Sequence, residues 1–305
     1  MQLIVAINCS ARKTAVPMSA LRARSLPRGT PSDLAAGWRA RCARAGGEIA
    51  ARRLYAGRGF SLACEIARSS GSELRVISAG MGLLSPDSAI PPYSLSVSQQ
   101  AQDCILHRAP RGLTFSAAEW WHVIRTRVRG VSPFAHLMAA RPRSLLLIAA
   151  TRPYLEMLVS ELASLDEPAQ NRIRILGPTH TQYLPEPLRH WAMPYDGRLD
   201  DVTKNLRGTA YDFPVRALAH FVNLVKLDRR IETAASHARR VRQSLAHWTA
   251  PSRPIRKRVD DSTLSRQIKI LKVQSIARTA GLRHLRSELG FACEQSRFAK
   301  AWESS

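Results

Sequence analysis

Four short apolar runs, rich in β-branched residues and leucine, recur along the chain and alternate with longer amphipathic stretches. Each run ends in small polar residues or a glycine, which is typical of a buried strand followed by a sharp turn. The runs predict strands over 2–8, 73–78, 144–150 and 172–176. Strands that alternate with helical stretches indicate an α/β fold, with a mainly parallel four-stranded sheet and helices on both faces.

The segments around these strands carry helix signals. Ser116 is a good N-cap for a helix over 116–126, and an amphipathic stretch with Ser32-Asp33 at its start runs through Arg44. The pattern predicts further helices over 60–69 and 153–164.

Beyond the fourth predicted strand, the pattern indicates a long loop and basic helices without further strands. A long loop over 184–216, rich in Pro, Tyr and Asp, leads into one or two basic helices over 213–248. Two prolines mark a linker near 249–258, and 262–302 has the spacing of a small basic helical module similar to a helix-turn-helix. This module could bind a duplex or dock on the sheet.

The charge balance also differs along the chain. The 305 residues include 46 Lys and Arg against 23 Asp and Glu, a formal net charge of +23 with a pI of about 11.2. Residues 228–305 hold 17 basic and 7 acidic residues, whereas 1–227 hold 29 and 16. We therefore expect an α/β core over 1–212 and a basic helical region over 213–305. Such an excess favours a nucleic-acid partner, although a general compositional bias toward arginine is an alternative.

Composition argues against several other classes of protein. No apolar stretch approaches the roughly 20 residues of a membrane span, and the N-terminal LIVAI run lacks the features of a signal peptide. The cysteines are odd in number and widely spaced, at positions 9, 42, 64, 104 and 293. This usage favours a cytoplasmic protein without a structural metal, and we expect no cofactor and no membrane partner. The oligomeric state stays open.

The turns after the first two predicted strands carry the candidate chemistry. Asn8-Cys9-Ser10 follows the first strand, and Ser78-Ala79-Gly80-Met81-Gly82 follows the second. Ligands of open α/β sheets bind outside the carboxyl ends of the strands. We therefore expect the two turns to line one site, joined by the loop over 195–216.

Four motifs in this order resemble a known family. They are Asn8-Cys9-Ser10-x-x-Lys13, Leu54-Tyr55-x-Gly57-x-x-Phe60, Ser78-Ala79-x-x-Gly82-Leu83 and Pro92-Tyr93. They look like α/β domains of largely unknown function that also resemble the core of archaeosine synthase and, through it, the uracil-DNA glycosylase superfamily. The segment V-A-I-N-C-S is similar to the G-I-N-P-G motif of mismatch-type uracil/thymine glycosylases, with Cys9-Ser10 in place of Pro-Gly. The resemblance covers roughly residues 2–180.

This resemblance implies excision of a modified base, as by anti-phage DNA glycosylases that act on glucosylated hydroxymethylcytosine. Such an enzyme flips the base, positions water, stabilises the departing base and holds the flanking phosphates. The candidate catalytic residues are Asn8, Asp87 and Asp212. The candidates for the base pocket are Cys9, Ser10, Tyr55, Ser78, Gly80, Gly82, Tyr93, His180 and Asp196. The candidates for DNA phosphates are Lys13, Arg58, Arg152, Arg207, Arg216 and Arg286.

Structural roles are the alternative for these residues. Asn8 and Ser10 could satisfy the amides of a turn, the glycines could serve only the turn, and the aromatic residues could belong to the core. Two other functions also stay open: a non-enzymatic DNA-binding stress protein and an RNA base-modifying enzyme. The expected partner is double-stranded DNA with one flipped base.

Overall fold

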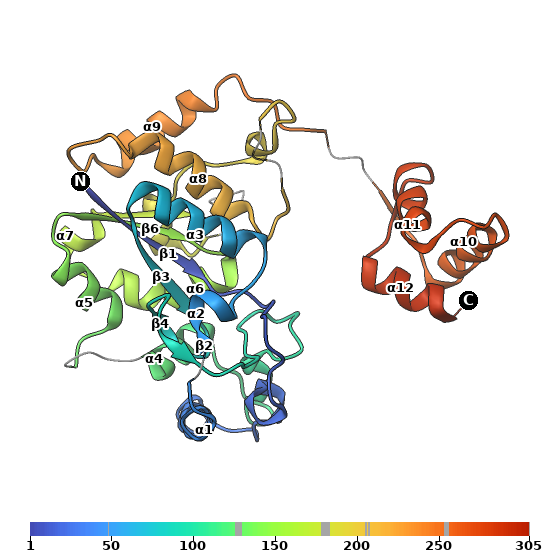
Figure 1. The fold of residues 1–305 in the computed structure, drawn as a ribbon, viewed down its shortest axis with the longest axis horizontal. Coiled ribbons are helices and arrows are strands. Elements are labelled where there is room, and N and C mark those ends of the chain that lie inside the picture. Colours follow the sequence, from blue (N-terminus) through green and yellow to red (C-terminus); the bar gives the residue numbers. More distant parts are fainter. Residues whose placement is uncertain are drawn as a thin grey trace. The chain divides into compact units, whose positions relative to one another are not determined.

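The computed structural model describes residues 1–47, 49–125, 130–177, 184–204, 206, 208–252 and 256–304. These residues form two compact units, Met1–Ala250 and Pro251–Ser305, and Figure 1 labels their α-helices and several of their strands. The strands are β1 (Gln2–Asn8), β2 (Ile49–Ala50), β3 (Glu73–Ser78), β4 (Gly82–Leu84), β5 (Ala89–Ile90), β6 (Ser144–Ala149), β7 (Ile173–Leu176), β8 (Lys257–Arg258) and β9 (Phe291–Ala292).

The α-helices of the first unit are α1 (Pro31–Ala45), α2 (Ala51–Leu54), α3 (Arg58–Ser70), α4 (Ala117–Ile124), α5 (Pro133–Ala140), α6 (Arg152–Ala163), α7 (Glu167–Gln170), α8 (Phe213–Val225) and α9 (Ala234–Ser244). Its 3-10 helices include η1 (Ser19–Leu21), η2 (Ala23–Ser25), η3 (Ile105–Arg108), η5 (Glu186–Trp191) and η6 (Gly197–Asp200). The second unit contains α10 (Asp261–Val273), α11 (Arg278–Ser287) and α12 (Gln295–Ser304).

A five-stranded sheet with the order β4-β3-β1-β6-β7 forms the centre of the first unit. The four predicted strands correspond to β1, β3, β6 and β7, and their pairings are parallel. The expected count of four is one short, because β4 returns antiparallel to β3 and pairs Gly82 with Ser78. The protein is therefore an α/β protein with a mostly parallel sheet.

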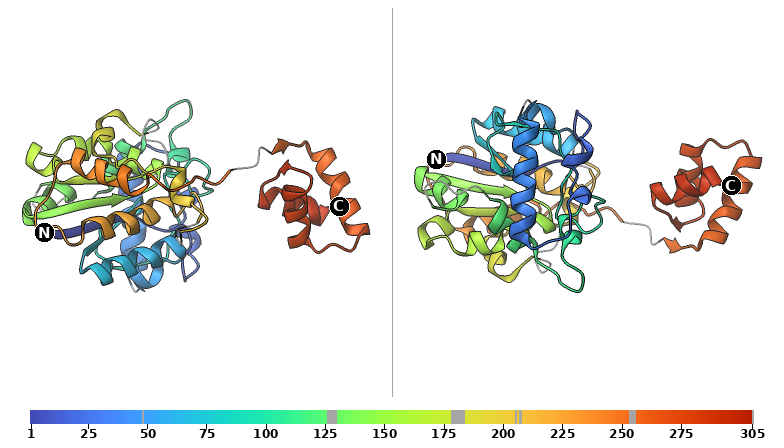
Figure 2. Two further views of the ribbon diagram at one scale, coloured as in Figure 1. Left: turned by 90° about the horizontal axis from the view of Figure 1, so that it is seen from above. Right: turned by 90° about the horizontal axis from the view of Figure 1, so that it is seen from below.

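Helices cover both faces of this sheet (Figure 2). On one face α3 packs against β1 and β3, while α8 packs against α3, β6 and β7. On the other face α4 packs against α6 and α1. The centre of β1 is fully buried, with Ile4, Val5 and Ala6 at 0% exposure, as a strand covered on both sides requires.

The order of the strands creates a topological switch point beside β1. The chain leaves β1 toward β3 on one side of the sheet, whereas β6, the other neighbour of β1, leads to β7 on the opposite side. The connections after β1 and β6 therefore diverge at the carboxyl ends of these strands, which is the position where open α/β folds bind ligands. Asn8 ends β1, and Thr151 follows β6, so these residues lie at the switch point.

The division between the units falls later than the sequence predicts. Helix α8 belongs to the first unit, because Phe213, Leu218 and Phe221 are buried in its core. The chain therefore continues in the same unit past the expected boundary at 212/213, and divides at Ala250/Pro251. This point lies inside the predicted linker over 249–258, of which 253–255 lie outside the described residues.

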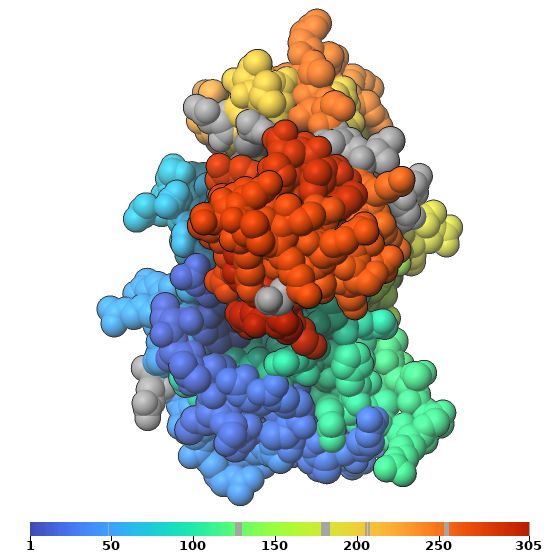
Figure 3. All heavy atoms as spheres, turned by 90° about the vertical axis from the view of Figure 1, so that its right-hand side faces the viewer, coloured from blue at the N-terminus to red at the C-terminus, as the bar shows by residue number. Residues whose placement is uncertain are grey.

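The second unit has an apolar core of its own, built from Leu264, Ile268, Leu271, Leu285, Cys293 and Phe298. Figure 3 draws its atoms in orange and red. Its sequence, 251–305, holds 12 Lys and Arg against 5 Asp and Glu. This part of the chain is thus helical, basic and separately packed.

A fragment that ends at Ala250 is expected to fold by itself, because the two units have separate apolar cores. Its far-ultraviolet circular dichroism and its thermal midpoint should match those of the same unit in the whole chain. The comparison needs both proteins at one concentration and pH. A fragment that is insoluble, or that melts without cooperativity, would show that the core of the first unit depends on the rest of the chain.

Candidate functional site

Five buried polar side chains meet at the carboxyl ends of β1 and β3, and we call them the carboxyl-end cluster: Cys9, Tyr55, Ser78, Tyr93 and Tyr154. Tyr93 lies at the centre, with its hydroxyl 2.7 Å from that of Tyr55 and 2.5 Å from Ser78 Oγ. Cys9 Sγ lies 3.3 Å from the Tyr154 hydroxyl and 3.9 Å from that of Tyr93. Five separate segments of the chain thus contribute to one group of hydrogen bonds.

Backbone hydrogen bonds hold the loop after β1 in the position that builds this cluster. The Cys9 amide donates to the Ile77 carbonyl at 2.8 Å, which continues the pairing of β1 with β3. Further along, the backbones of Lys13 and Tyr55 pair in an isolated antiparallel β-bridge, and the Thr14 amide donates to the Leu54 carbonyl at 2.9 Å. The first motif is therefore laid beside the second, which explains why Cys9 and Tyr55 meet.

Lys13 covers the aromatic part of the carboxyl-end cluster. Its ammonium nitrogen lies 4.5 Å from the centre of the Tyr93 ring and 5.5 Å from that of Tyr55, and it donates to the Ser10 carbonyl at 3.2 Å. Burial lowers the pKa of the Lys13 amine, while the negative charges possible at Cys9 and Asp103 oppose this shift. The expected phosphate ligand is thus a half-buried cation over two aromatic rings.

The cluster tyrosines retain their protons at neutral pH. Burial raises the pKa of Tyr55, Tyr93 and Tyr154, and a negative charge at Cys9 would raise each pKa further. A neutral phenol is both a donor and an acceptor of hydrogen bonds. Each phenol is therefore able to donate one hydrogen bond and to accept others within the cluster.

Asn8 connects two strands. Its Oδ1 accepts from the Thr151 amide at 3.0 Å, and its Nδ2 donates to the Cys9 carbonyl at 3.1 Å. The carboxamide thus ties the end of β1 to the segment after β6 at the switch point. This contact gives Asn8 a positioning role in the fold, whereas the resemblance implies a catalytic role for it.

The backbone amides of the glycine turn after β3 form hydrogen bonds within the turn itself. The amides of Gly80 and Met81 donate to Ser78 Oγ at 3.2 and 2.9 Å, so both are satisfied within the turn. A Cβ atom on Gly80 would lie 2.7 Å from the Tyr93 ring, and Gly82 has a φ of +74°. The two glycines therefore serve close packing and turn geometry.

Asp212 and Arg216 form a buried ion pair beside the start of α3. Arg216 is 1% exposed, and its guanidinium lies 2.9 Å from Asp212 and 2.6 Å from Asp200. Asp212 also accepts from the Thr209 amide at 2.7 Å and lies 3.6 Å from the exposed Arg58. Arg216 is therefore a buried cation held by two carboxylates, and its burial argues against the predicted contact with DNA phosphates.

Other predicted residues lie outside the carboxyl-end cluster. Asp87 pairs with Arg52 at 2.7 Å on the surface, where both side chains are more than half exposed. Asp196 pairs with Arg198 at 2.9 Å and accepts from its amide, which begins η6. These contacts give both carboxylates structural partners.

Two predicted phosphate ligands also have intramolecular partners. Arg152 pairs with Glu156 at 2.7 Å along α6, and Arg286 donates to the Cys293 carbonyl at 2.7 Å within the second unit. The predicted residues His180 and Arg207 lie outside the described residues.

Tyr154 is the member of the cluster that sequence reasoning missed. It lies in the first turn of α6, directly after β6. The same rule that selected the turns after the first two strands, applied to the third, would have found it. Ser10, a predicted member, lies at the edge instead and donates to the Ala56 carbonyl.

The described residues contain no group of three or more metal-ligating side chains that could hold an ion. Among them, no helix combines the length and the apolar character that a membrane crossing requires. A scan against protein-family models, a search of curated proteins and a search of solved structures found no match for this chain.

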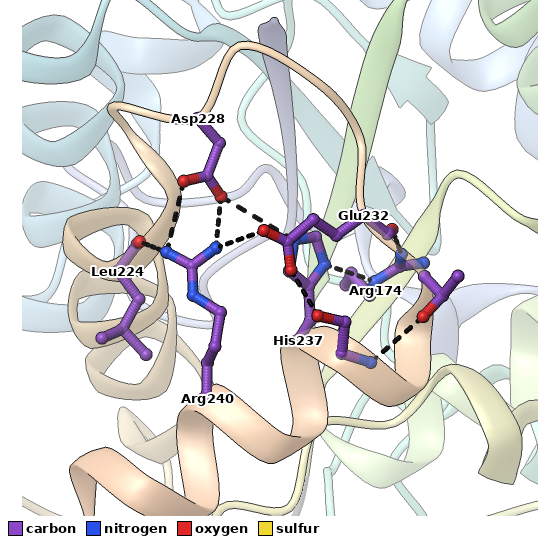
Figure 4. Close-up of polar contacts among 8 residues, drawn as sticks. Arg174, Leu224, Asp228, Glu232, His237 and Arg240 are labelled. Carbon is purple, nitrogen blue, oxygen red and sulfur yellow. Dashed lines mark hydrogen bonds and ion pairs between the residues drawn. The ribbon is translucent and has the colours of Figure 1, made fainter.

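A second buried network lies at the β7 edge of the sheet, between β7 and α9 (Figure 4). Arg174 of β7 donates to Nδ1 of His237 at 2.9 Å, and both side chains are fully buried. Arg240 pairs with Asp228 at 2.6 Å and with Glu232 at 3.2 Å. The network fixes α9 on the edge strand.

The first unit is expected to lose stability as the pH falls from about 6.5 to about 4. Burial, with a smaller effect of Arg174 and Arg240, lowers the pKa of His237 to about 4, from an ordinary value near 6.5. In this pH range His237 therefore becomes protonated in the unfolded chain while it stays largely neutral in the folded chain. The cost should reach about 3 kcal/mol at the acid end, while the full stability is present above pH 6.5.

Urea unfolding between pH 4 and 7.5, followed by fluorescence, measures this dependence. His237→Gln should flatten the curve, whereas substitution of the exposed His247 by Gln should leave it unchanged. Equal curves for the wild type and His237→Gln would assign the acid sensitivity to other groups.

Proposed function

We propose that this protein is an enzyme that hydrolyses the N-glycosidic bond of a modified base in DNA, with the carboxyl-end cluster and Lys13 as its site. The observation that carries this proposal is the position of the cluster. Buried hydroxyl and thiol groups from five segments gather beside the switch point of the sheet, where open α/β folds bind their ligands. An apolar core would not need these hydrogen-bonding groups there.

In this reaction water attacks C1′ of the sugar, the bond from C1′ to the base nitrogen breaks, and its electron pair leaves with the base. The base then takes up one proton, and the water-derived hydroxyl remains on C1′. Cationic and hydrogen-bonding groups near the departing base lower the barrier because negative charge develops there. Lys13 and the protonated tyrosines are of this kind.

The surroundings of the cluster support a polyanionic substrate. Arg12, in the loop after β1, is exposed next to the half-buried Lys13, and Arg58, at the start of α3, is also exposed. Side chains of this type hold the phosphates that flank a flipped nucleotide. The net charge of +23, which is denser per residue in the second unit, agrees with this substrate class.

The direct test is the formation of abasic sites. Duplexes that carry glucosylated hydroxymethylcytosine, uracil or no modification are incubated with the protein, and strand cleavage by alkali is measured. We expect cleavage of a modified duplex and none of the plain one. Binding without excision from any duplex would instead indicate a DNA-binding protein, and base release from RNA alone would indicate an RNA-directed enzyme.

A further inference from the structure

A pocket of about 420 Å³ lies between η5 and α9, and it shares no residue with the carboxyl-end cluster. Its polar wall consists of Arg189 and His190 from η5 together with Arg239 and Arg242 from α9. Ala192, directly after η5, and Ala234, Ala235 and Ala238 of α9 complete the lining. The volume falls in the range of small-ligand sites, roughly 300–1,000 Å³.

The ionisable side chains that line this pocket are three arginines and one histidine, with no carboxylate among them. Arg239 and Arg242 are three positions apart, so they lie on the same face of α9, and both are exposed. Burial lowers the pKa of His190, so this ring adds hydrogen-bonding groups without a permanent charge at neutral pH. The pocket therefore favours an anion.

The nearby carboxylates are held by a different arginine. Arg240 engages both Asp228 and Glu232 in the network of Figure 4. Arg239 and Arg242 flank Arg240 in the sequence but line the pocket. Asp228 and Glu232 are thus paired with Arg240, and neither of them lines the pocket.

The alanines and the start of α9 adapt the pocket to a tetrahedral anion. Ala234 and Ala235 are the first two residues of α9, where backbone amides and the positive end of the helix dipole favour negative charge. Ala238 lies one turn further along and fills little space. A phosphoryl group is bound well by forked guanidinium donors, and the arginines of this wall supply such donors beside small alanine side chains.

We propose that the pocket between η5 and α9 binds a phosphoryl group, either of a nucleic-acid strand or of a free nucleotide. The proposal does not depend on cleavage of a glycosidic bond. It places a phosphate site on the first unit, apart from the carboxyl-end cluster.

The test compares two double variants of the whole chain with equal loss of charge. Arg239→Gln/Arg242→Gln removes the pocket cations, whereas Arg229→Gln/Arg230→Gln removes two exposed cations from the loop before α9. Fluorescence anisotropy with a labelled ten-nucleotide DNA strand, and calorimetry with AMP, measure the two phosphate sources. We expect the pocket variant to bind at least one probe about tenfold more weakly than the loop variant does.

Loss for the strand alone would identify a nucleic-acid phosphate, and loss for AMP as well would show that the pocket also takes a free nucleotide. Ala235→Glu gives an independent check, because it places a carboxylate at this exposed position in the wall and should weaken the same probe. Equal affinities of the pocket and loop variants for both probes would overturn the proposal.

Discussion

Asp212→Ala is expected to lower the free energy of unfolding by about 3 kcal/mol. The substitution leaves the guanidinium of Arg216, which is 1% exposed, with Asp200 as its remaining carboxylate partner, and it removes the acceptor of the Thr209 amide. Removing one partner of a buried ion pair costs about 3–5 kcal/mol, and the remaining Asp200 places this case at the lower end. Urea unfolding of the purified variant measures the effect.

Asp87→Ala is the matched control, because Asp87 also forms an ion pair with an arginine but on the surface. Exposed pairs contribute about 0–1 kcal/mol, so this variant should unfold close to the wild type. If Asp212→Ala were as stable as Asp87→Ala and lost only base excision, Asp212 would be a catalytic residue, as the sequence suggested.

Lys13→Met is expected to lower the rate of base excision by about 100-fold or more, because it removes the cation beside the departing base. Methionine has a similar length and is apolar, so it can keep the contacts with the Tyr55 and Tyr93 rings that Lys13 makes. The thermal midpoint should therefore change little. Single-turnover cleavage of the preferred modified duplex, with the protein in excess, separates the chemical step from binding.

Arg12→Met is the control for this experiment, because Arg12 is an exposed cation one residue away. It should weaken DNA binding and reduce the dependence of affinity on salt, with an unchanged rate for the bound duplex. A Lys13→Met protein with normal single-turnover excision would remove Lys13 from the proposed site and leave it as a structural or binding cation.

The parallel strands could be predicted from the sequence because a strand covered on both faces is a continuous apolar run bounded by turn residues. Strand β4 could not, because its three residues are too few to show a periodicity. Helix α8 was assigned to a separate basic region, yet Leu218 and Phe221 bury their side chains in the first unit. The positive charges around a helix describe its exposed face and give little information on where the apolar face packs.

The candidate site was predictable where it depends on strand ends. Cys9 and Ser78 follow from that rule, and the family resemblance adds Tyr55 and Tyr93. The position of Lys13 over two rings and the burial of Arg216 depend on partners far away in the sequence, so charge alone suggested phosphate contacts for both. Tertiary partners decide whether an arginine or a lysine faces solvent.

The glycine turn after β3 sets the direction of hydrogen bonding in the cluster. Ser78 Oγ accepts from two backbone amides, so both of its acceptor positions are occupied and its own proton must point to the Tyr93 oxygen. Tyr93 then has a single proton to give, either to Tyr55 or to Cys9. The two amides of this turn therefore fix Ser78 as the donor in its hydrogen bond with Tyr93. Only the hydrogen bonds of Tyr93 with Tyr55 and Cys9 can change direction when a ligand binds.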